Sequence, residues 1–265
     1  MAAPKLRLLV SILFLPAFSE AQSSHTRIEE FLRTAEVISA QPVGKGKTVT
    51  WRLTLKDAEI THDASFQSID ERAAAKDLGG GRTEVQFVDS YRYNVAAYQL
   101  ARLLRLDDMV PVSVERKWRT ETGALTWWVD DVLGDENEIK EKGLKAPDAN
   151  DWSDQIYKVR VFSQLVHDTD RNRGNLLITS AWRLWMIDFT RAFRRSPRLQ
   201  NVKGLERCDR ELLQALKDLT RESLDTALND TLTKAEIDGL AARRELLVQH
   251  YVALIRDRGE SAILY

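Results

Sequence analysis

Residues 167–178 have the sequence HDTDRNRGNLLI, and residues 185–189 follow with WMIDF. The pattern predicts that an apolar helix over 152–167 ends in a loop of polar and charged side chains. A short apolar strand, Leu176–Ile178, leaves this loop, and a second strand, Leu184–Ile187, returns to it after a turn. The stretch therefore predicts a hairpin whose open end adjoins the charged loop.

This hairpin is expected to bring Asp170, Asn175 and Asp188 together, because Asn175 precedes the first strand and Asp188 ends the second. Phosphoryl transfer uses such a set of side chains. One carboxylate orients the attacking hydroxyl, while an amide oxygen and a second carboxylate hold a divalent metal against the nucleotide phosphates. We therefore interpret Asp170 as the catalytic residue, and Asn175 and Asp188 as ligands for Mg²⁺ or Mn²⁺.

Asn175 follows Asp170 by five residues, and Asp188-Phe189 comes 13 residues after Asn175. In these motifs the chain resembles the protein-kinase-like superfamily, which has a D-x-x-x-x-N catalytic loop and a D-F-G aspartate. It is most similar to the atypical kinases of the secretory pathway and to type II phosphatidylinositol kinases, which carry comparable D-R-x-x-x-N and I-D segments. The resemblance implies ATP as the nucleotide and an α+β fold of two lobes. The expected parts are a small mixed N-terminal lobe over 22–134, a mostly helical C-terminal lobe over 135–265, and a catalytic-loop-like segment over 167–193.

Two positions differ from the family pattern in the N-terminal lobe. In the family, a strand lysine contacts the nucleotide phosphates and pairs with a glutamate of the following helix. The matching strand here offers Gln67, and the matching helix offers Asn94. The joint loss of both charges is coherent, because losing one partner would leave an unpaired charge in a confined site. We predict that Gln67 and Asn94 still dock the strand against the helix.

An amide pair cannot neutralise phosphate charge, so the positive charge must come from other side chains. The candidates are Arg171, Arg173 and Arg191 near the predicted loop, and Lys45 and Lys47 in a glycine-containing hairpin of the N-terminal lobe. That hairpin lacks the spacing of a phosphate-binding loop and leads into a strand, so a plain turn is an equally good interpretation.

The rest of the chain is interpreted from its periodicity and its turn residues. Trp128 and Val129 are candidates for the nucleotide site, although Trp127 and Trp128 are also typical core side chains. We expect helices over 28–38, 91–106, 152–167, 210–219, 221–232 and 233–256, strands over 48–55, 64–69, 110–117 and 124–133, a flexible loop over 73–82 and a polar connector over 135–150.

Composition excludes several classes of protein. The 265 residues carry 39 Lys+Arg and 40 Asp+Glu. This balance argues against a nucleic-acid-binding protein, which needs a basic excess or a basic stripe. The single cysteine, Cys208, excludes a disulfide scaffold and a zinc site built from several thiolates.

The N-terminus has the pattern of a secretory signal peptide over Met1–Ala21. Lys5 and Arg7 precede an apolar run of about ten residues, and small residues follow at a potential cleavage site. This run is too short to cross a bilayer, and no later run is long enough. We therefore expect a secreted or periplasmic protein without a membrane span.

Three functions agree with these observations. The first is an exported kinase-like enzyme that transfers phosphate from ATP to an acceptor that the sequence does not identify. The second is a pseudokinase, which keeps the fold and binds nucleotide or protein. The third, less favoured, is a metal-dependent hydrolase built from Asp168, Asp170 and Asp188. A calcium loop starting at Asp168 is disfavoured, because Arg173 stands where such a loop has glycine.

Overall fold

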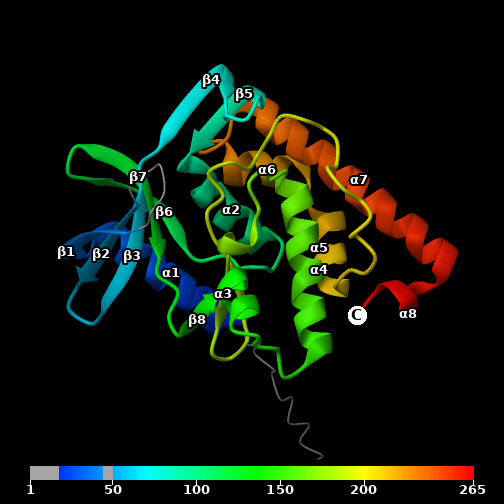
Figure 1. Cartoon of the computed structure of the whole chain (residues 1–265), viewed down its shortest axis with the longest axis horizontal. Coiled ribbons are helices and arrows are strands. Elements are labelled where there is room, and N and C mark those ends of the chain that lie inside the picture. Colours follow the sequence, from blue (N-terminus) through cyan, green and yellow to red (C-terminus); the bar gives the residue numbers. More distant parts are fainter. Residues whose placement is uncertain (1–17, 44–49) are drawn as a thin grey trace, which may run out of the picture.

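A computed structural model describes residues 18–43 and 50–265 of the chain. It shows an α+β protein of two parts, an antiparallel sheet region formed mainly by the N-terminal half and a helical region formed by the C-terminal half (Figure 1). The predicted two-lobed fold class is confirmed. Residues 1–17 of the predicted signal peptide lie outside the described residues, and so do Lys45 and Lys47.

The main sheet has five strands in the order β1-β2-β3-β7-β6, all antiparallel neighbours. Apolar and polar side chains alternate along these strands, so that Leu53, Leu55, Ala64, Phe66 and Leu125 are completely buried on one face. Helices α1 and α2 contact strands β6 and β7. The bounds are α1 (Phe18–Thr34), β1 (Glu36–Val43), β2 (Thr50–Lys56), β3 (Thr61–Gln67), α2 (Arg92–Leu103), β6 (Ser113–Trp118) and β7 (Glu121–Trp127).

A long hairpin extends from this region toward the C-terminal helices (Figure 1). It consists of β4 (Asp70–Asp77) and β5 (Thr83–Ser90), paired from end to end. The predicted flexible loop over 73–82 is therefore wrong, because Ala73–Asp77 forms part of a strand. The glycine-rich turn itself is present, and Gly79, Gly80 and Gly81 all have positive φ.

A second sheet of three strands lies between the two regions. Its order is β10-β9-β8, with β8 (Val132–Asp135), β9 (Leu176–Thr179) and β10 (Leu184–Met186). The β9–β10 hairpin forms as predicted. The strand predicted over 124–133 is divided between β7 and β8, and the polar connector contains the short helix α3 (Glu136–Glu141). Asp135 caps this helix by accepting a hydrogen bond from the Glu138 N–H at 2.9 Å.

The C-terminal region packs around α4 and α7. Phe162 and Leu165 of α4 and Leu240 and Leu247 of α7 are completely buried. Arg243 of α7 is also completely buried, and its guanidinium donates to the carbonyls of Leu165 and Arg194. The helices are α4 (Ala149–Val166), the short 3₁₀ helix η1 (Arg173–Asn175), α5 (Arg210–Asp218), α6 (Arg221–Leu228), α7 (Lys234–Arg258) and α8 (Glu260–Ile263). Within the described ranges, no helix has the length and apolar character to span a membrane.

Candidate active site

The loop after α4 is held together by a buried ion pair. His167 ends the helix in the left-handed conformation (φ 49°) and contacts the Arg198 carbonyl through Nδ1. Asp168 is 4% exposed, accepts a hydrogen bond from the Asp170 N–H at 3.0 Å and lies 2.7 Å from Arg171 Nη2. Asp168 therefore shapes the loop, and both of its carboxylate oxygens contact protein groups.

Arg171 connects the loop to the end of β10. Its Nη1 donates to the carbonyl of Asn175 at 2.8 Å and to that of Ile187 at 2.6 Å, and its guanidinium covers the ring of Phe189 at 4.4 Å. The prediction that Arg171 contacts the nucleotide is therefore wrong, since the side chain is directed into the protein. Arg171 instead holds the backbone of Asn175 and Ile187 in place, a role that its charge alone does not reveal.

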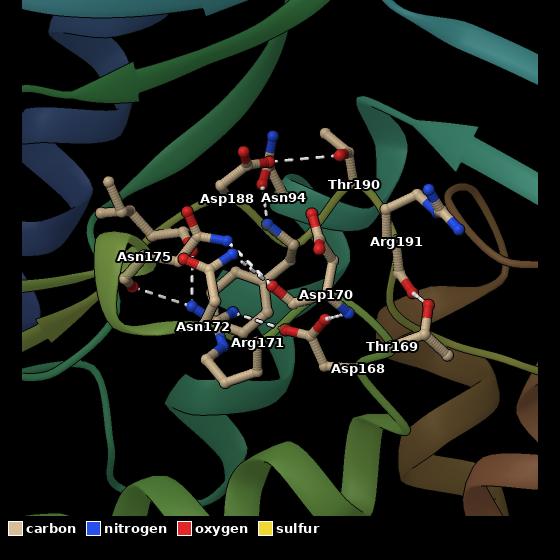
Figure 2. A network of polar contacts seen from close by, with 12 residues as sticks. Asn94, Asp168, Thr169, Asp170, Arg171, Asn172, Asn175, Asp188, Thr190 and Arg191 are labelled. Carbon is tan, nitrogen blue, oxygen red and sulfur yellow. Dashed lines mark hydrogen bonds and ion pairs between the residues drawn. The ribbon is translucent and has the colours of Figure 1, made fainter. Parts of the chain in front are cut away.

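Asp170, Asn175 and Asp188 lie around one end of the β9–β10 hairpin (Figure 2). The Asn175 side chain donates through Nδ2 to the Asp170 carbonyl at 3.1 Å, and the Asn175 carbonyl accepts from the Ile187 N–H at 3.1 Å. Asn175 is thus bonded to the residue that precedes Asp188. The carboxylates of Asp170 and Asp188 point toward the same side of the loop (Figure 2).

Asp188 has a constrained backbone and a carboxyl group with a shifted pKa. Its φ is 55°, a left-handed value that Asp adopts more readily than most residues. Its Oδ1 accepts a hydrogen bond from the Thr190 hydroxyl at 3.1 Å. Burial raises the pKa of the Asp188 carboxyl, whereas the hydrogen bonds from Thr190 and the charge of Arg171 oppose the rise.

Gln67 and Asn94 meet across the upper wall of the site. Asn94 Nδ2 donates to Gln67 Oε1 at 2.7 Å, and Asn94 Oδ1 accepts from the backbone N–H of Phe189, also at 2.7 Å. Asn94 therefore connects strand β3 to the residue that follows Asp188. The predicted contact between strand and helix is present, and its extension to the Phe189 backbone was not foreseen.

A cavity of about 400 Å³ lies between the main sheet and the β9–β10 hairpin. Its polar lining includes Gln67, Asn94, Asn175 and Asp188, and Trp128 also lines it. Most of its remaining lining is apolar, from Val110, Val129, Val132, Leu177 and Met186. No Lys or Arg lines it among the residues that the structure describes.

Arg173 does not belong to this cavity. Its side chain is half exposed and lies 3.5 Å from Glu136 of α3, so it forms a surface ion pair. The prediction that Arg173 binds nucleotide therefore finds no support in its position.

The structure adds Asp89, a site residue that the sequence interpretation missed. Asp89 lies near the end of β5, and the next residue, Ser90, donates its N–H to the Thr190 carbonyl at 2.9 Å. Burial raises the pKa of the Asp170 carboxyl, and the charges of Asp168 and Asp89 add to the rise, while Arg191 opposes it. The only signal in the sequence was an acidic residue shortly before a helix.

The oxygen atoms of this site suit a hard divalent cation. Asn175 and Asp188 both face the cavity and offer an amide oxygen and a carboxylate. Mg²⁺ commonly binds one or two protein oxygens and takes its other ligands from phosphate and water. Over residues 18–43 and 50–265, no three His, Cys, Asp or Glu side chains gather as a complete metal site. A metal held by Asn175 and Asp188 would therefore need further ligands from outside the protein.

Comparison with known proteins identifies the fold. No protein-family model matches the chain, and no curated protein is similar to it in sequence. A Fam20 protein from hydra, solved with sugar, has a TM-score of 0.68 and 15% identity, and the match covers 93% of each chain. The Golgi casein kinase with Mn and ADP bound has a TM-score of 0.66 and 12% identity, over 92% of this chain and 79% of that one.

A third similar structure is CtkA, a proinflammatory kinase of Helicobacter pylori. Its TM-score is 0.54 at 9% identity, and the match covers 85% of this chain and 96% of that chain. The fold of this protein is thus that of the atypical protein-kinase-like superfamily.

Proposed function

We propose that the protein is an exported, atypical kinase-like phosphotransferase that uses ATP with Mg²⁺ or Mn²⁺. The observation that carries the proposal is the convergence of Asp170, Asn175 and Asp188 beside an apolar cavity of about 400 Å³. The fold supports it, because the similar structures include the Golgi casein kinase with Mn and ADP bound.

Each polar residue has a distinct role in this proposal. Asp170 accepts the proton of the acceptor hydroxyl as the bond between the acceptor oxygen and the γ-phosphorus forms. The bond from that phosphorus to the β–γ bridging oxygen breaks, and ADP leaves. Asn175 and Asp188 would hold the metal, which neutralises phosphate charge when it is bound. Trp128 and Val129, at the apolar end of the cavity, would contact the base.

A pseudokinase is the second candidate, and one observation favours it. The amide pair Gln67–Asn94 stands where the sequence resemblance expects the family's lysine–glutamate pair, and no described cation lines the cavity. Such a protein would bind nucleotide and not transfer phosphate. Lys45 and Lys47, which lie in the sequence between β1 and β2 and outside the described residues, are the remaining candidates for a cation from the N-terminal lobe.

Nucleotide binding by calorimetry, with and without Mg²⁺ or Mn²⁺, followed by transfer of radiolabelled phosphate, tests the proposal. Asp188→Ala should abolish metal-dependent ATP binding. Asp170→Ala should retain binding and lose transfer, and Asp225→Ala, which removes an exposed carboxylate on α6, should change neither. ATP binding without transfer to any acceptor would favour the pseudokinase. Undiminished metal-dependent binding in Asp188→Ala would refute both.

Export is proposed from the Met1–Ala21 segment. Cleavage after Ala21 would remove only the first four residues of α1 and would keep Phe31 and Leu32, which are completely buried in the core. N-terminal sequencing of the protein from the culture medium or periplasm tests this, with Gln22 as the expected first residue.

A further inference from the structure

Two arginines beyond Asp188 share one carboxylate from the β4–β5 hairpin. Arg194 Nη2 lies 2.5 Å from Glu84 Oε1, and Arg191 contacts Glu84 Oε2. The three side chains are 11–20% exposed. The ring of Phe87, also on β5, faces the Arg191 guanidinium at 4.5 Å, which fixes its position.

This cluster lies beside the proposed catalytic aspartate. Arg194 Nη2 donates to the hydroxyl of Thr169 at 3.2 Å, and Thr169 directly precedes Asp170. The Arg191 carbonyl accepts from the N–H and from the hydroxyl of Thr169, at 3.3 and 3.0 Å. Arg191 is also close enough to Asp170 for its charge to act on that carboxyl.

Glu84, Thr169 and Arg194 line a cavity of about 630 Å³, separate from the apolar one. Arg72 and Glu236 face the same cavity and pair with each other at 3.1 Å, so their charges cancel. Arg195, exposed at its rim, has no ion-pair partner within the part of the chain that the structure describes. Among the side chains that line this cavity, three arginines face two carboxylates, an excess of one positive charge.

Glu84 does not satisfy all the hydrogen-bond donors of Arg191 and Arg194. Arg191 Nε, Arg194 Nε and Arg194 Nη1 are buried without a hydrogen-bond partner. Within this group of three side chains, two guanidinium charges exceed one carboxylate charge, and Asp170 and Asp89 act on the arginines from outside the group. A phosphomonoester carries close to two negative charges at neutral pH and three terminal oxygens, and arginine binds such groups with paired N–H donors.

From these observations we infer that Arg191 and Arg194 form a binding site for a phosphate group on the acceptor, and that Glu84 occupies this site in the free protein. The inference rests on the proposed kinase function and names its acceptor class as a hydroxyl compound that already carries a phosphomonoester. Binding of that phosphate displaces Glu84 and places the acceptor hydroxyl near Asp170.

The test measures binding in the absence of nucleotide and divalent metal, at constant ionic strength. Glu84→Gln removes the competing charge, so calorimetry should show inorganic phosphate binding at least tenfold tighter than in wild type. Arg194→Gln added to Glu84→Gln should abolish this binding. Glu71→Gln is the matched control, since Glu71 lies on the same hairpin and pairs with the half-buried Lys76. Its phosphate affinity should equal that of wild type.

Three further probes separate the possible outcomes. Glycerol 3-phosphate should bind Glu84→Gln at least as tightly as inorganic phosphate, and glycerol should not bind. A site that takes inorganic phosphate and excludes glycerol 3-phosphate would overturn the acceptor assignment. No phosphate binding in Glu84→Gln, or equal binding after Arg194→Gln, would overturn the site itself. Phosphate binding should persist in Glu84→Gln with Asp188→Ala, whatever the result for ATP.

Discussion

The bridge made by Asn94 predicts a measurable link between stability and nucleotide binding. Asn94→Ala removes the hydrogen bond to Gln67 and leaves the Phe189 N–H, in a residue that is 2% exposed, without its acceptor. An orphaned buried donor costs about 1–3 kcal/mol, and the lost bond to Gln67 costs about 1 kcal/mol. We expect Asn94→Ala to lower the free energy of unfolding by about 3 kcal/mol, a drop in Tm of roughly 6–12 °C.

A double-mutant cycle isolates the contact between the two amides. Gln67→Ala should cost about 1 kcal/mol, because it leaves the bond from Phe189 to Asn94 intact. The double variant should cost about 1 kcal/mol less than the sum of the two single variants. Guanidinium denaturation followed by tryptophan fluorescence measures all four proteins. Strictly additive losses would refute the coupling.

Gln155 provides the control for function. It is another buried amide that accepts a backbone N–H, from Leu184 at 2.8 Å, and it also donates to the Trp182 carbonyl at 3.0 Å. Gln155→Ala should destabilise the protein by a similar amount and leave metal-dependent ATP affinity unchanged. Asn94→Ala should weaken that affinity at least tenfold, because the Phe189 N–H loses its acceptor and the backbone next to Asp188 is no longer held in place. Equal ATP affinities in the two variants would show that the Asn94 bridge is structural only.

The remaining predictions concern the loop itself. Arg171→Met leaves the Asp168 carboxylate buried and unpaired, so we expect a loss of about 3–5 kcal/mol in chemical denaturation, against at most ~1 kcal/mol for the exposed Arg173→Met. Equal losses would contradict the positioning role of Arg171. Transfer requires ionised Asp170, whose pKa is raised by burial, so kcat should fall with decreasing pH through that raised pKa. Arg191→Gln removes a charge that lowers this pKa and should shift the acid limb of the kcat profile to higher pH, whereas the rim variant Arg195→Gln should not.

The arrangement of Asp170, Asn175 and Asp188 was predictable because it depends on short-range pattern. An apolar helix, a polar loop and two short apolar strands follow one another within residues 152–189, and the strand pairing fixes which ends meet. The contact between Gln67 and Asn94 was predictable for a different reason. The kinase pattern has a lysine and a glutamate at the positions of Gln67 and Asn94. Because both charges are replaced together, the two amides were expected to meet as the charged pair does.

Other parts of the site depend on long-range contacts that leave no local signal. Strand β4 contains three consecutive alanines, which have low strand propensity, and it forms only by pairing with β5. Since residues 73–82 were expected to be a flexible loop, the position of Glu84 on the neighbouring strand beside Arg191 and Arg194 could not be inferred. Arg171 was misinterpreted because a sequence shows the charge of a side chain and not the direction in which it points.

The charges around the apolar cavity explain why the proposed metal would control nucleotide binding. Asp188 lines this cavity, Asp89 acts on its carboxyl, and no described cation lines the cavity. A nucleotide that enters alone brings further negative charge to this carboxylate and is repelled. Burial raises the pKa of Asp188 and thereby favours the neutral acid, whereas a bound divalent cation favours the carboxylate. Because Asn94 is uncharged, it can hold the Phe189 backbone whether Asp188 is protonated or ionised. The neutral pair would therefore keep the site assembled, while the proposed metal would supply the positive charge that the kinase pattern assigns to a lysine.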